Sequence, residues 1–353
     1  MKQYGRTFNH LEDLIFFYGY DGTLEAIQHI KEITNNTSSV RMKWDGELQI
    51  YWGREYVNGP LIMNGHNGWS RGYKCSTPDE LYNFIINLSG KDRENASDER
   101  KNFALKFGSL FQLLDAATPQ DFVGFVYADA LYLNKPDLYN DEYNFCPNHT
   151  SYYVHKDTSI GKRIEKSEIL LVGHAYFNAF GISDDHQEPL NNFDQFNLTN
   201  EVIILNPYYS NNKIKYKLDR YTECLLLNLA THINDFLAPI NGVSSFRDYI
   251  YKYMNYKMKN KSNDSFVEWM ISKSMISLSQ QDKIKKRIEE QVSGNSMFML
   301  IDEIASIKNI LIEELENHDC DIKAHNPEGW VVYSNDKKQF GHIKLVPRHT
   351  WTP

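Results

Sequence analysis

The sequence predicts an α+β protein whose main domain is interrupted by an inserted helical module. Strand-like segments and a few helices occupy residues 1–217, and a run of helical patterns fills residues 218–317. Strand character returns within residues 318–353. We therefore expect the two outer segments to fold as one domain, because an inserted module needs its two ends close together.

Each element follows from its own residue pattern. Apolar residues at helical spacing predict a helix from Leu11 to Ile33. Two short strands are predicted at 40–43 and 48–52, joined at Asp45-Gly46, a dipeptide typical of tight turns. Further strands are predicted at 122–127, 169–177, 202–205, 330–333 and 340–346, and helices at 103–114 and across 218–316.

The composition is that of a globular protein. Of the 353 residues, 41% are hydrophobic and 24% are charged, which excludes global disorder and fibrous repeats. No uncharged run approaches the roughly 20 residues needed to cross a bilayer. The N-terminus lacks the apolar run of a secretory signal. We therefore expect a cytoplasmic protein with no membrane partner.

The four cysteines, Cys75, Cys146, Cys224 and Cys320, lie far apart in the sequence. No CxxC pair occurs, so the spacing argues against a structural zinc site of the usual kind and against a disulfide framework. We expect reduced thiols.

Charge is distributed unevenly along the chain. The net charge of −8 argues against a uniformly basic nucleic-acid coat. Residues 211–290, however, hold 14 Lys and Arg against 9 Asp and Glu, which gives this segment +5 and leaves −13 on the rest. The helical module is therefore basic and the body acidic.

The motif Lys43-Trp44-Asp45-Gly46 lies between two predicted strands, and by itself it is typical of a hairpin with a surface lysine. Three further residues accompany it in a particular order. Asp129 follows the predicted strand 122–127, Glu328 precedes the strand 330–333, and Lys344 lies in the last strand.

In this order the pieces resemble the covalent nucleotidyltransferase superfamily of ATP-dependent DNA ligases, RNA ligases and mRNA capping enzymes. The likeness spans residues 40–346 outside the helical module. The resemblance implies a ligase-type adenylyltransferase (ATP-grasp-like) domain of antiparallel sheets flanked by helices. Several stretches also resemble ligase-like nucleotidyltransferases of large tailed bacteriophages, which implies the host cytoplasm as location: HLEDLIFFYGYDGTLEAI, MKWDGELQIYWG, CPNHTSYYVHKDTSIGKRIEKSEILLVGHAYF and GHIKLVPR.

The resemblance implies that Lys43 is a nucleophile that attacks the α-phosphate of ATP and forms a lysyl-AMP. An amine of this kind attacks only when it is neutral. Asp45 and Gly46 would shape the loop that presents it, with no Cβ at Gly46 to obstruct the phosphate. Lys344 would contact the α-phosphate and stabilise charge that develops in the transition state.

The resemblance also implies how the rest of the nucleotide is held. Asp129 corresponds to an acidic residue that contacts ribose or metal, and Glu328 to a glutamate that binds metal. Mg²⁺ follows from the triphosphate and two carboxylate ligands. Tyr176 or Phe177 on the strand 169–177 would stack on adenine, and packing in the core explains either ring equally well.

Three positions depart from the family pattern. Leu48 stands where ligases often have an arginine, so Arg54 or Arg71 would have to replace it. His342 stands where the last motif usually has a second lysine. Lys344 lies nine residues before the last residue of the sequence, so we expect no C-terminal OB barrel, which favours an RNA-ligase-like enzyme.

The basic helical module is the predicted nucleic-acid contact. Its lysines would bind phosphates and its interleaved tyrosines would stack on unpaired bases. A solvated charged helix surface explains the same pattern. The residues concerned are Lys252, Lys257, Lys259 and Lys261 with Tyr251, Tyr253 and Tyr256.

The predicted function is therefore that of an ATP-dependent polynucleotide ligase. It would adenylate itself on Lys43 and transfer AMP to a nucleic-acid 5′-phosphate for strand joining, with RNA favoured over DNA. Two alternatives stay open. The AMP passes to another acceptor, such as a protein, or the chain is a nucleotide-binding phage component without turnover.

Overall fold

The computed structural model describes residues 8–35, 39–88, 95–182, 188–189, 192–206, 214–243, 246–260, 262–273, 276–290, 292–316, 321–325, 327–333 and 342–347. Within this part of the chain the fold is α+β, as predicted from the sequence, and the structure has many helices and three open sheets. The chain divides into two compact units, which are described separately. Unit 1 comprises Met1–Lys43, Tyr209–His318 and Glu328–Pro353, and unit 2 comprises Trp44–Tyr208 and Asp319–Pro327.

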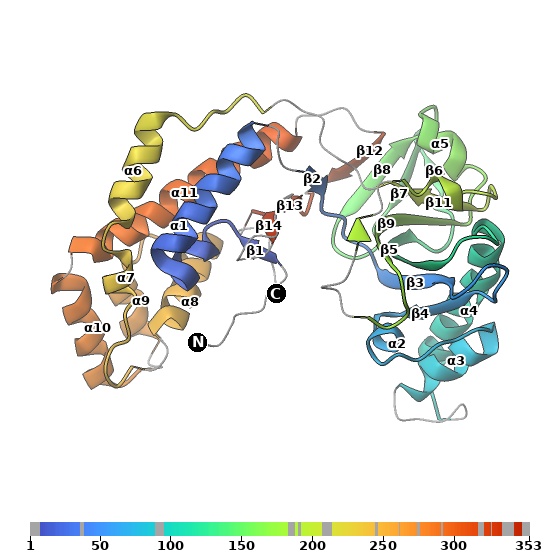
Figure 1. Cartoon of the computed structure of the whole chain (residues 1–353), viewed down its shortest axis with the longest axis horizontal. Helices are drawn as coiled ribbons and strands as arrows, with labels where there is room; N and C mark the ends of the chain where they lie inside the picture. The colour runs from blue at the N-terminus through green and yellow to red at the C-terminus, as the bar shows by residue number, and fades with distance from the viewer. Residues whose placement is uncertain are drawn as a thin grey trace. The chain divides into compact units, whose positions relative to one another are not determined.

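The unit 1 sheet is built from the two ends of the chain. Its strands β1 and β2, blue in Figure 1, pair with the red strands β13 and β14 in the order β1-β14-β13-β2. The β1–β14 pair is parallel and the other pairs are antiparallel. The strands are β1 (Phe8–His10), β2 (Ser39–Met42), β13 (Trp330–Tyr333) and β14 (His342–Leu345).

Helices make up the rest of the described part of unit 1. The long helix α1 packs against α6, α7 and α8, and α11 packs against α6, α7, α10 and β14 (Figure 1). Their apolar faces are buried, as the helical spacing of the leucines and isoleucines predicts. The helices are α1 (Asp13–Thr34), α6 (Arg220–Ala230), α7 (Ile233–Phe236), α8 (Phe246–Asn260), α9 (Phe266–Ser272), α10 (Leu278–Glu290) and α11 (Val292–Glu316).

The grouping of segments differs from the one expected from the sequence. The helices within 218–317 form one unit with α1 and with strands from both chain ends, whereas residues 44–208 form a unit of their own. The reason is strand pairing, because β2 pairs with β13 and β3 pairs with β4 and β5. The predicted hairpin across Asp45-Gly46 is therefore wrong, since its two strands lie in different sheets.

The large sheet of unit 2 has the order β10-β9-β5-β3-β4, with β11 paired in parallel to β9. The β3–β4, β3–β5, β5–β9 and β9–β10 pairs are antiparallel. The strands are β3 (Leu48–Arg54), β4 (Ile62–Gly65), β5 (Gly124–Tyr132), β9 (Ile169–Phe177), β10 (Glu188–Pro189) and β11 (Val202–Leu205). The helices of this unit are α2 (His66–Ser70), α3 (Pro78–Asn87), α4 (Asp98–Ala117) and α5 (Ser159–Ile164), with the 3₁₀ turn η2 (Asp194–Phe196).

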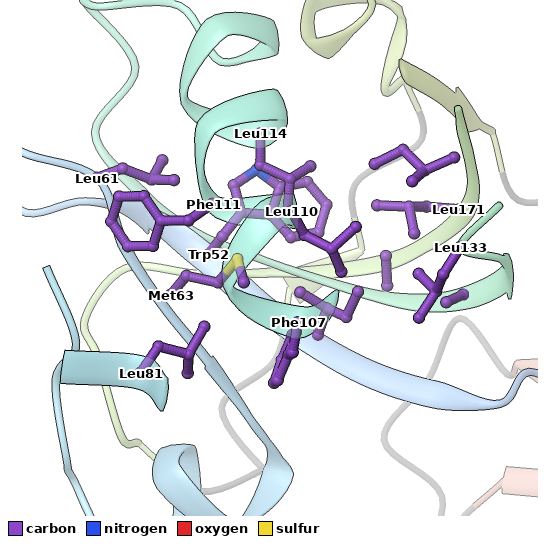
Figure 2. Packing of buried hydrophobic residues seen from close by; sticks show 14 of the residues in the cluster. Trp52, Leu61, Met63, Leu81, Phe107, Leu110, Phe111, Leu114, Leu133 and Leu171 are labelled. Atoms are coloured by element: carbon purple, nitrogen blue, oxygen red, sulfur yellow. The ribbon is translucent and has the colours of Figure 1, made fainter. Parts of the chain in front are cut away.

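A hydrophobic core holds α3 and α4 against one face of the large sheet. Figure 2 shows side chains of α4 gathered near Trp52 and Met63 of the sheet. The buried residues of α4 recur every three or four positions, which gives the helix one apolar side. They include Ala104, Phe107, Leu110, Phe111 and Leu114.

The small sheet of unit 2 has the order β12-β8-β7-β6, and all its pairs are antiparallel. Its strands are β6 (Leu138–Tyr139), β7 (Glu142–Phe145), β8 (Ser151–His155) and β12 (Ile322–His325). The connection between β7 and β8 contacts the Lys43-Trp44-Asp45-Gly46 motif through its unit 2 residue Asp45. None of the described helices combines the length and the hydropathy that a membrane crossing requires.

Candidate active site

The structure joins Lys43 and Glu328 in unit 1. Lys43 directly follows β2, and its backbone N–H donates to the carbonyl oxygen of Gly329 at 2.8 Å, which continues the β2–β13 pairing. The Nζ atom of Lys43 donates a hydrogen bond to Oε1 of Glu328. The side chains are 31% and 23% exposed, so the ion pair is accessible to solvent.

Gly329 fixes the path of the chain after Glu328. Its φ angle is +124°, a conformation that side chains disfavour. A Cβ atom at this position would lie 2.3 Å from the carbonyl oxygen of Leu345 on β14. Only glycine therefore lets β14 pass so closely, and the Glu328-Gly329 dipeptide is the sequence signal for it.

Lys344 lies on the same face of the unit 1 sheet as Lys43. Lys344 is directly opposite Val331, and Val331 is opposite Arg41. Residues directly opposite one another share a face, and so do residues two apart along a strand. Lys43 is two residues beyond Arg41, so both predicted catalytic lysines project from one face.

Asp45 anchors the motif to the β7–β8 connection of unit 2. Its Oδ1 accepts a hydrogen bond from Asn148 Nδ2 at 2.9 Å, and its Oδ2 accepts from the backbone N–H groups of His149 (2.7 Å) and Thr150 (2.8 Å). Burial alone would raise the pKa of Asp45, but the hydrogen bonds from His149, Asn148 and Thr150 outweigh it and lower the pKa below its ordinary value.

Gly46 lies tightly against β5. A Cβ atom on Gly46 would be 2.5 Å from Cβ of Asp129 and 3.1 Å from the carbonyl oxygen of Ala130. The next residue, Glu47, donates its backbone N–H to the same carbonyl at 2.9 Å. Close packing against β5 is therefore one reason for glycine at position 46. It adds to the reason implied by the family resemblance, that a Cβ here would obstruct the phosphate.

Asp129 belongs to a polar cluster on the large sheet of unit 2. Its Oδ1 accepts a hydrogen bond from the Tyr127 hydroxyl at 3.1 Å, and His174 Nε2 lies 3.1 Å from its Oδ2. Gln49 Nε2 donates to the same Tyr127 hydroxyl at 3.0 Å. Sequence reasoning missed His174, although a histidine inside the apolar run ILLVGHAYF was a visible signal.

Tyr176 and Phe177, the two candidates for adenine stacking, have different surroundings. Phe177 is fully buried in a cluster of aromatic and aliphatic side chains. Tyr176 is partly buried, its hydroxyl donates to the carbonyl oxygen of Val123 at 3.2 Å, and its ring packs edge-on against Phe122. Of the two rings, Tyr176 keeps more exposed surface.

Arg54, a proposed replacement for the missing arginine, is held inside unit 2. It is 1% exposed, and its guanidinium donates to the carbonyl oxygen of Gly59 at 2.7 Å and to Asp115 Oδ1 at 2.6 Å. These hydrogen bonds satisfy the buried guanidinium, so a structural role accounts for Arg54. Arg71, the other replacement, is exposed at the end of α2.

The two predicted metal ligands belong to different units. Asp129 contacts Tyr127 and His174 in unit 2, and Glu328 pairs with Lys43 in unit 1. No cluster of three or more metal-binding side chains occurs in the described ranges. Mg²⁺ usually takes only one or two carboxylates together with substrate phosphates, so a single carboxylate such as that of Glu328 fits this kind of ligand set.

The tyrosines of α8 contact other parts of unit 1. Tyr253 is 5% exposed, and Tyr256 donates its hydroxyl hydrogen to Asp264 Oδ2 at 3.0 Å. Lys257 pairs with Asp302 at 2.7 Å. These contacts reduce the aromatic surface available for stacking on bases.

The other predicted contacts of α8 differ in exposure. Tyr251 packs on Phe16 and Phe17. Lys252 and Lys259 are exposed, and Lys261 lies outside the described residues.

Residues 91–352 match a protein family described as a family of unknown function, DUF6267. The matched range contains Asp129, Glu328 and Lys344 but begins after Lys43. No curated protein and no solved structure matches the chain.

Proposed function

Since the chain belongs to the DUF6267 family, whose function is unknown, we propose a function from its site: an ATP-dependent nucleotidyltransferase of the ligase type. It forms a lysyl-AMP on Lys43 and transfers the AMP to a nucleic-acid 5′-phosphate for strand joining. The proposal includes a ligase-type adenylyltransferase fold.

One observation carries the proposal. Lys43 and Glu328, which are 285 residues apart in the sequence, form a solvent-accessible ion pair, and Lys344 projects from the same sheet face as Lys43. A lysine nucleophile, a carboxylate beside it and a second lysine are the groups that attack on a phosphate requires.

The proposed reaction forms one bond and breaks one. The neutral Nζ of Lys43 attacks the α-phosphorus of ATP, a P–N bond forms, and the bond from that phosphorus to the bridging oxygen breaks. The electron pair leaves with pyrophosphate. The protons lost by Nζ pass to Glu328 and solvent, and the Lys344 ammonium stabilises the charge on the α-phosphate oxygens.

The remaining roles follow the resemblance. Glu328 in unit 1 would be a carboxylate ligand of Mg²⁺, which supplies positive charge beside the phosphates, and Asp129 in unit 2 is the other carboxylate that the resemblance names. Asp129 is alternatively a ribose contact, and Tyr176 is the proposed adenine contact. Asp45 and Gly46 are proposed positioning residues, because their contacts within unit 2 fix the second half of the motif.

The test is covalent labelling. The protein is incubated with α-labelled ATP or GTP and Mg²⁺ and then separated under denaturing conditions. We expect label from ATP on the wild type and none on Lys43→Ala. Lys31→Ala is the matched control, because Lys31 forms a similarly exposed ion pair with Glu223 in the same unit.

Two outcomes would contradict the proposal. If the wild type is not labelled with any of several divalent metal ions, the proposed adenylation activity is wrong. If Lys43→Ala is still labelled, the assignment of Lys43 as the nucleophile is wrong. Tight ATP binding without any adduct would instead support the alternative of a nucleotide-binding protein without turnover.

The acceptor is tested with the adenylated protein. Exposed Lys252 and Lys259 on α8 are the proposed nucleic-acid contacts. We expect 5′-phosphorylated RNA, more than DNA, to discharge the AMP and to give a joined product. Transfer of label to a protein with no joined strand would favour the alternative of protein AMPylation.

A further inference from the structure

The small sheet of unit 2 is buried on one side and accessible to solvent on the other. Successive residues of a strand point to alternate sides, and residues directly opposite one another share a side. Five residues of the buried side are at most 8% exposed: Tyr143, Phe145, Tyr152, Val154 and Ile322. We call the other side the open face, and its residues include Tyr139, Glu142, Asn144, Tyr153, Lys323 and His325.

The open face presents aromatic rings to solvent. Tyr139 on β6 is 71% exposed. Tyr153 on β8 stacks on His325 of β12, with the ring centroids 4.6 Å apart and the ring planes 24° from parallel. His325 is exposed and Tyr153 is partly exposed, so the stacked pair is accessible. These rings lie opposite the buried side, so core packing does not account for them, and aromatic side chains are enriched at binding surfaces.

A cation lies beside the stacked pair. Lys323 is directly opposite Tyr153 in the sheet and is exposed. Its ammonium forms no hydrogen bond or ion pair with another residue of the described ranges, so it can bind an anion without breaking such a contact. Asp321, which precedes the strand, is already engaged, because it accepts hydrogen bonds from Ser159 Oγ at 2.6 Å and from the backbone N–H of Ile160 at 3.3 Å.

The two ends of the open face differ in charge. At one end Glu142 lies directly opposite His155 on β8. At the other end lies Lys323, whose partner on β8 is Tyr153. Asn144, opposite Tyr153 on β7, offers an uncharged amide that can hydrogen-bond the edge of a base. A phosphate is therefore favoured at the Lys323 end.

The Lys323 end is also the end next to the connection that holds Asp45. Strand β8 begins at Ser151, directly after Thr150, whose backbone N–H donates to Asp45 Oδ2 at 2.8 Å. Tyr153 follows Thr150 by three residues, about 10 Å along the strand. A ligand bound at Tyr153 is therefore close to the second half of the Lys43-Trp44-Asp45-Gly46 motif, which belongs to the same unit.

The open face supplies the ring surface that α8 lacks. The sequence predicts stacking of bases on the tyrosines of α8, but Tyr253 is buried, Tyr256 is hydrogen-bonded to Asp264 and Tyr251 packs on other rings. Helix α8 thus offers exposed lysines with little free ring surface, whereas Tyr139 on the open face offers a largely exposed ring.

We propose that the open face binds a single-stranded end of a nucleic acid. One base stacks on the Tyr153–His325 pair, and the Lys323 ammonium binds a phosphate. Tyr139 lies two strands from Tyr153, roughly 10 Å across the sheet, and takes a second base. Single strands are preferred to duplexes because only unpaired bases expose their ring faces. That this strand is the acceptor of AMP rests on the proposed function, whereas the binding itself does not.

The first experiment needs no adenylation activity. Fluorescence anisotropy measures the binding of a short 5′-phosphorylated RNA to wild type, Tyr153→Ala, Tyr153→Phe, His325→Ala and the control Tyr56→Ala. Tyr56 is 61% exposed in the same unit and lies just after β3, outside the small sheet. We expect Tyr153→Ala and His325→Ala to weaken binding about tenfold, Tyr153→Phe to stay within about twofold of the wild type, and Tyr56→Ala to have no effect.

The second experiment separates charge from stacking. Lys323→Met should reduce the slope of log affinity against log salt concentration by about one, because one phosphate contact is lost. Tyr153→Ala should weaken binding at every salt concentration and leave the slope unchanged. A duplex of the same sequence should bind more weakly than the single strand. With the preformed lysyl-AMP protein, Tyr153→Ala should slow the discharge of AMP by RNA about tenfold at subsaturating RNA.

The binding proposal and the proposed function fail separately. Circular dichroism checks folding, and if Tyr153→Ala does not fold, His325→Ala and Tyr139→Ala carry the measurement. A wild type that binds no single-stranded RNA, a preference for the duplex, or folded ring variants with wild-type affinity would overturn the open face as a binding surface. Ring-dependent RNA binding by a protein that never forms an adduct would support the open face and contradict the proposed enzyme activity.

Discussion

The Nζ atom of Lys43 donates a hydrogen bond to Oε1 of Glu328 across 285 residues of sequence. The two meet because β2 and β13 are neighbours, with Met42 opposite Trp330, so the residues flanking these strands emerge together. A nucleophilic lysine must lose a proton before it attacks, and an adjacent carboxylate is a suitable acceptor.

Glu328→Gln keeps the size of the side chain and removes its charge. We expect adduct formation to slow by about 10²-fold or more, because the proton acceptor is lost. Single-turnover labelling with α-labelled ATP measures the rate. Glu223→Gln, which breaks the comparable Lys31 pair, should label at the wild-type rate. Equal rates for Glu328→Gln and the wild type would remove Glu328 from the mechanism.

Asp45→Asn replaces a carboxylate that accepts three hydrogen bonds by an amide with only one acceptor oxygen. An amide accepts through one oxygen only, so the backbone N–H groups of His149 and Thr150 and the amide of Asn148 no longer all find an acceptor. We expect a loss of about 1–3 kcal/mol in the free energy of unfolding at neutral pH. Urea unfolding followed by circular dichroism measures it.

The wild type and Asp45→Asn should also differ in how their stability depends on pH. The pKa of Asp45 is lowered in the folded state, so its contribution to stability is present above the ordinary value of 3.8 and is lost as the pH falls through the folded pKa. The difference between wild type and Asp45→Asn should therefore shrink below about pH 3.8. A difference that stays constant with pH would show that the charge of Asp45 contributes nothing.

Gly46→Ala tests whether the glycine is required by β5. The new Cβ would lie 2.5 Å from Cβ of Asp129, so the loop or the strand must shift. We expect a loss of about 1–3 kcal/mol in the free energy of unfolding. Gly65→Ala is the control, because a Cβ there would meet its nearest neighbour at an ordinary 3.5 Å. Equal effects of the two substitutions would contradict this explanation.

The sequence predicted features that depend on local pattern. The α+β class and the helix now seen as α11 follow from periodicity, because residues such as Leu300, Ile304 and Leu311 face one buried side. The strands at 40–43 and 330–333 were recognised by their apolar content. The grouping of Lys43 with Glu328 was expected only through the family resemblance.

Features that depend on strand register were beyond the sequence. Nothing local shows that β2 pairs with β13 rather than with β3, and one residue of slip would move Arg41 to the other face. The same holds for His174, which meets Asp129 beside an irregularity in the β5–β9 pairing. The partners of Asp45 also come from a connection about a hundred residues away.

Cys75 should be the slowest of the described cysteines to react. Burial, together with the charge of Glu80, raises the pKa of its thiol to about 12, and only the thiolate is alkylated. Cys146 and Cys224 are exposed. At mildly alkaline pH we expect iodoacetamide to modify these two about a thousandfold faster, as peptide mass spectrometry can measure. Rapid modification of Cys75 in the folded protein would contradict its burial.

Lys308→Met should be far more destabilising than the loss of an exposed ion pair. Lys308 Nζ donates to Glu12 Oε1 at 2.6 Å and to the carbonyl oxygen of Val346 at 3.1 Å, and both side chains are almost fully buried. Removing the cation leaves the Glu12 carboxylate buried without it, at a cost of about 3–5 kcal/mol. Lys31→Met, whose partner Glu223 is partly exposed, should cost less than about 1 kcal/mol.

A second substitution separates charge from packing at this pair. Adding Glu12→Gln to Lys308→Met neutralises the stranded carboxylate, so the double variant should be more stable than Lys308→Met alone, and the two effects should not add. Val346 lies just beyond β14, the strand that carries Lys344, so this pair also holds that strand to α11. If Lys308→Met unfolds at the same urea concentration as Lys31→Met, the pair contributes no more than an exposed one, and the position of β14 must depend on its strand partners alone.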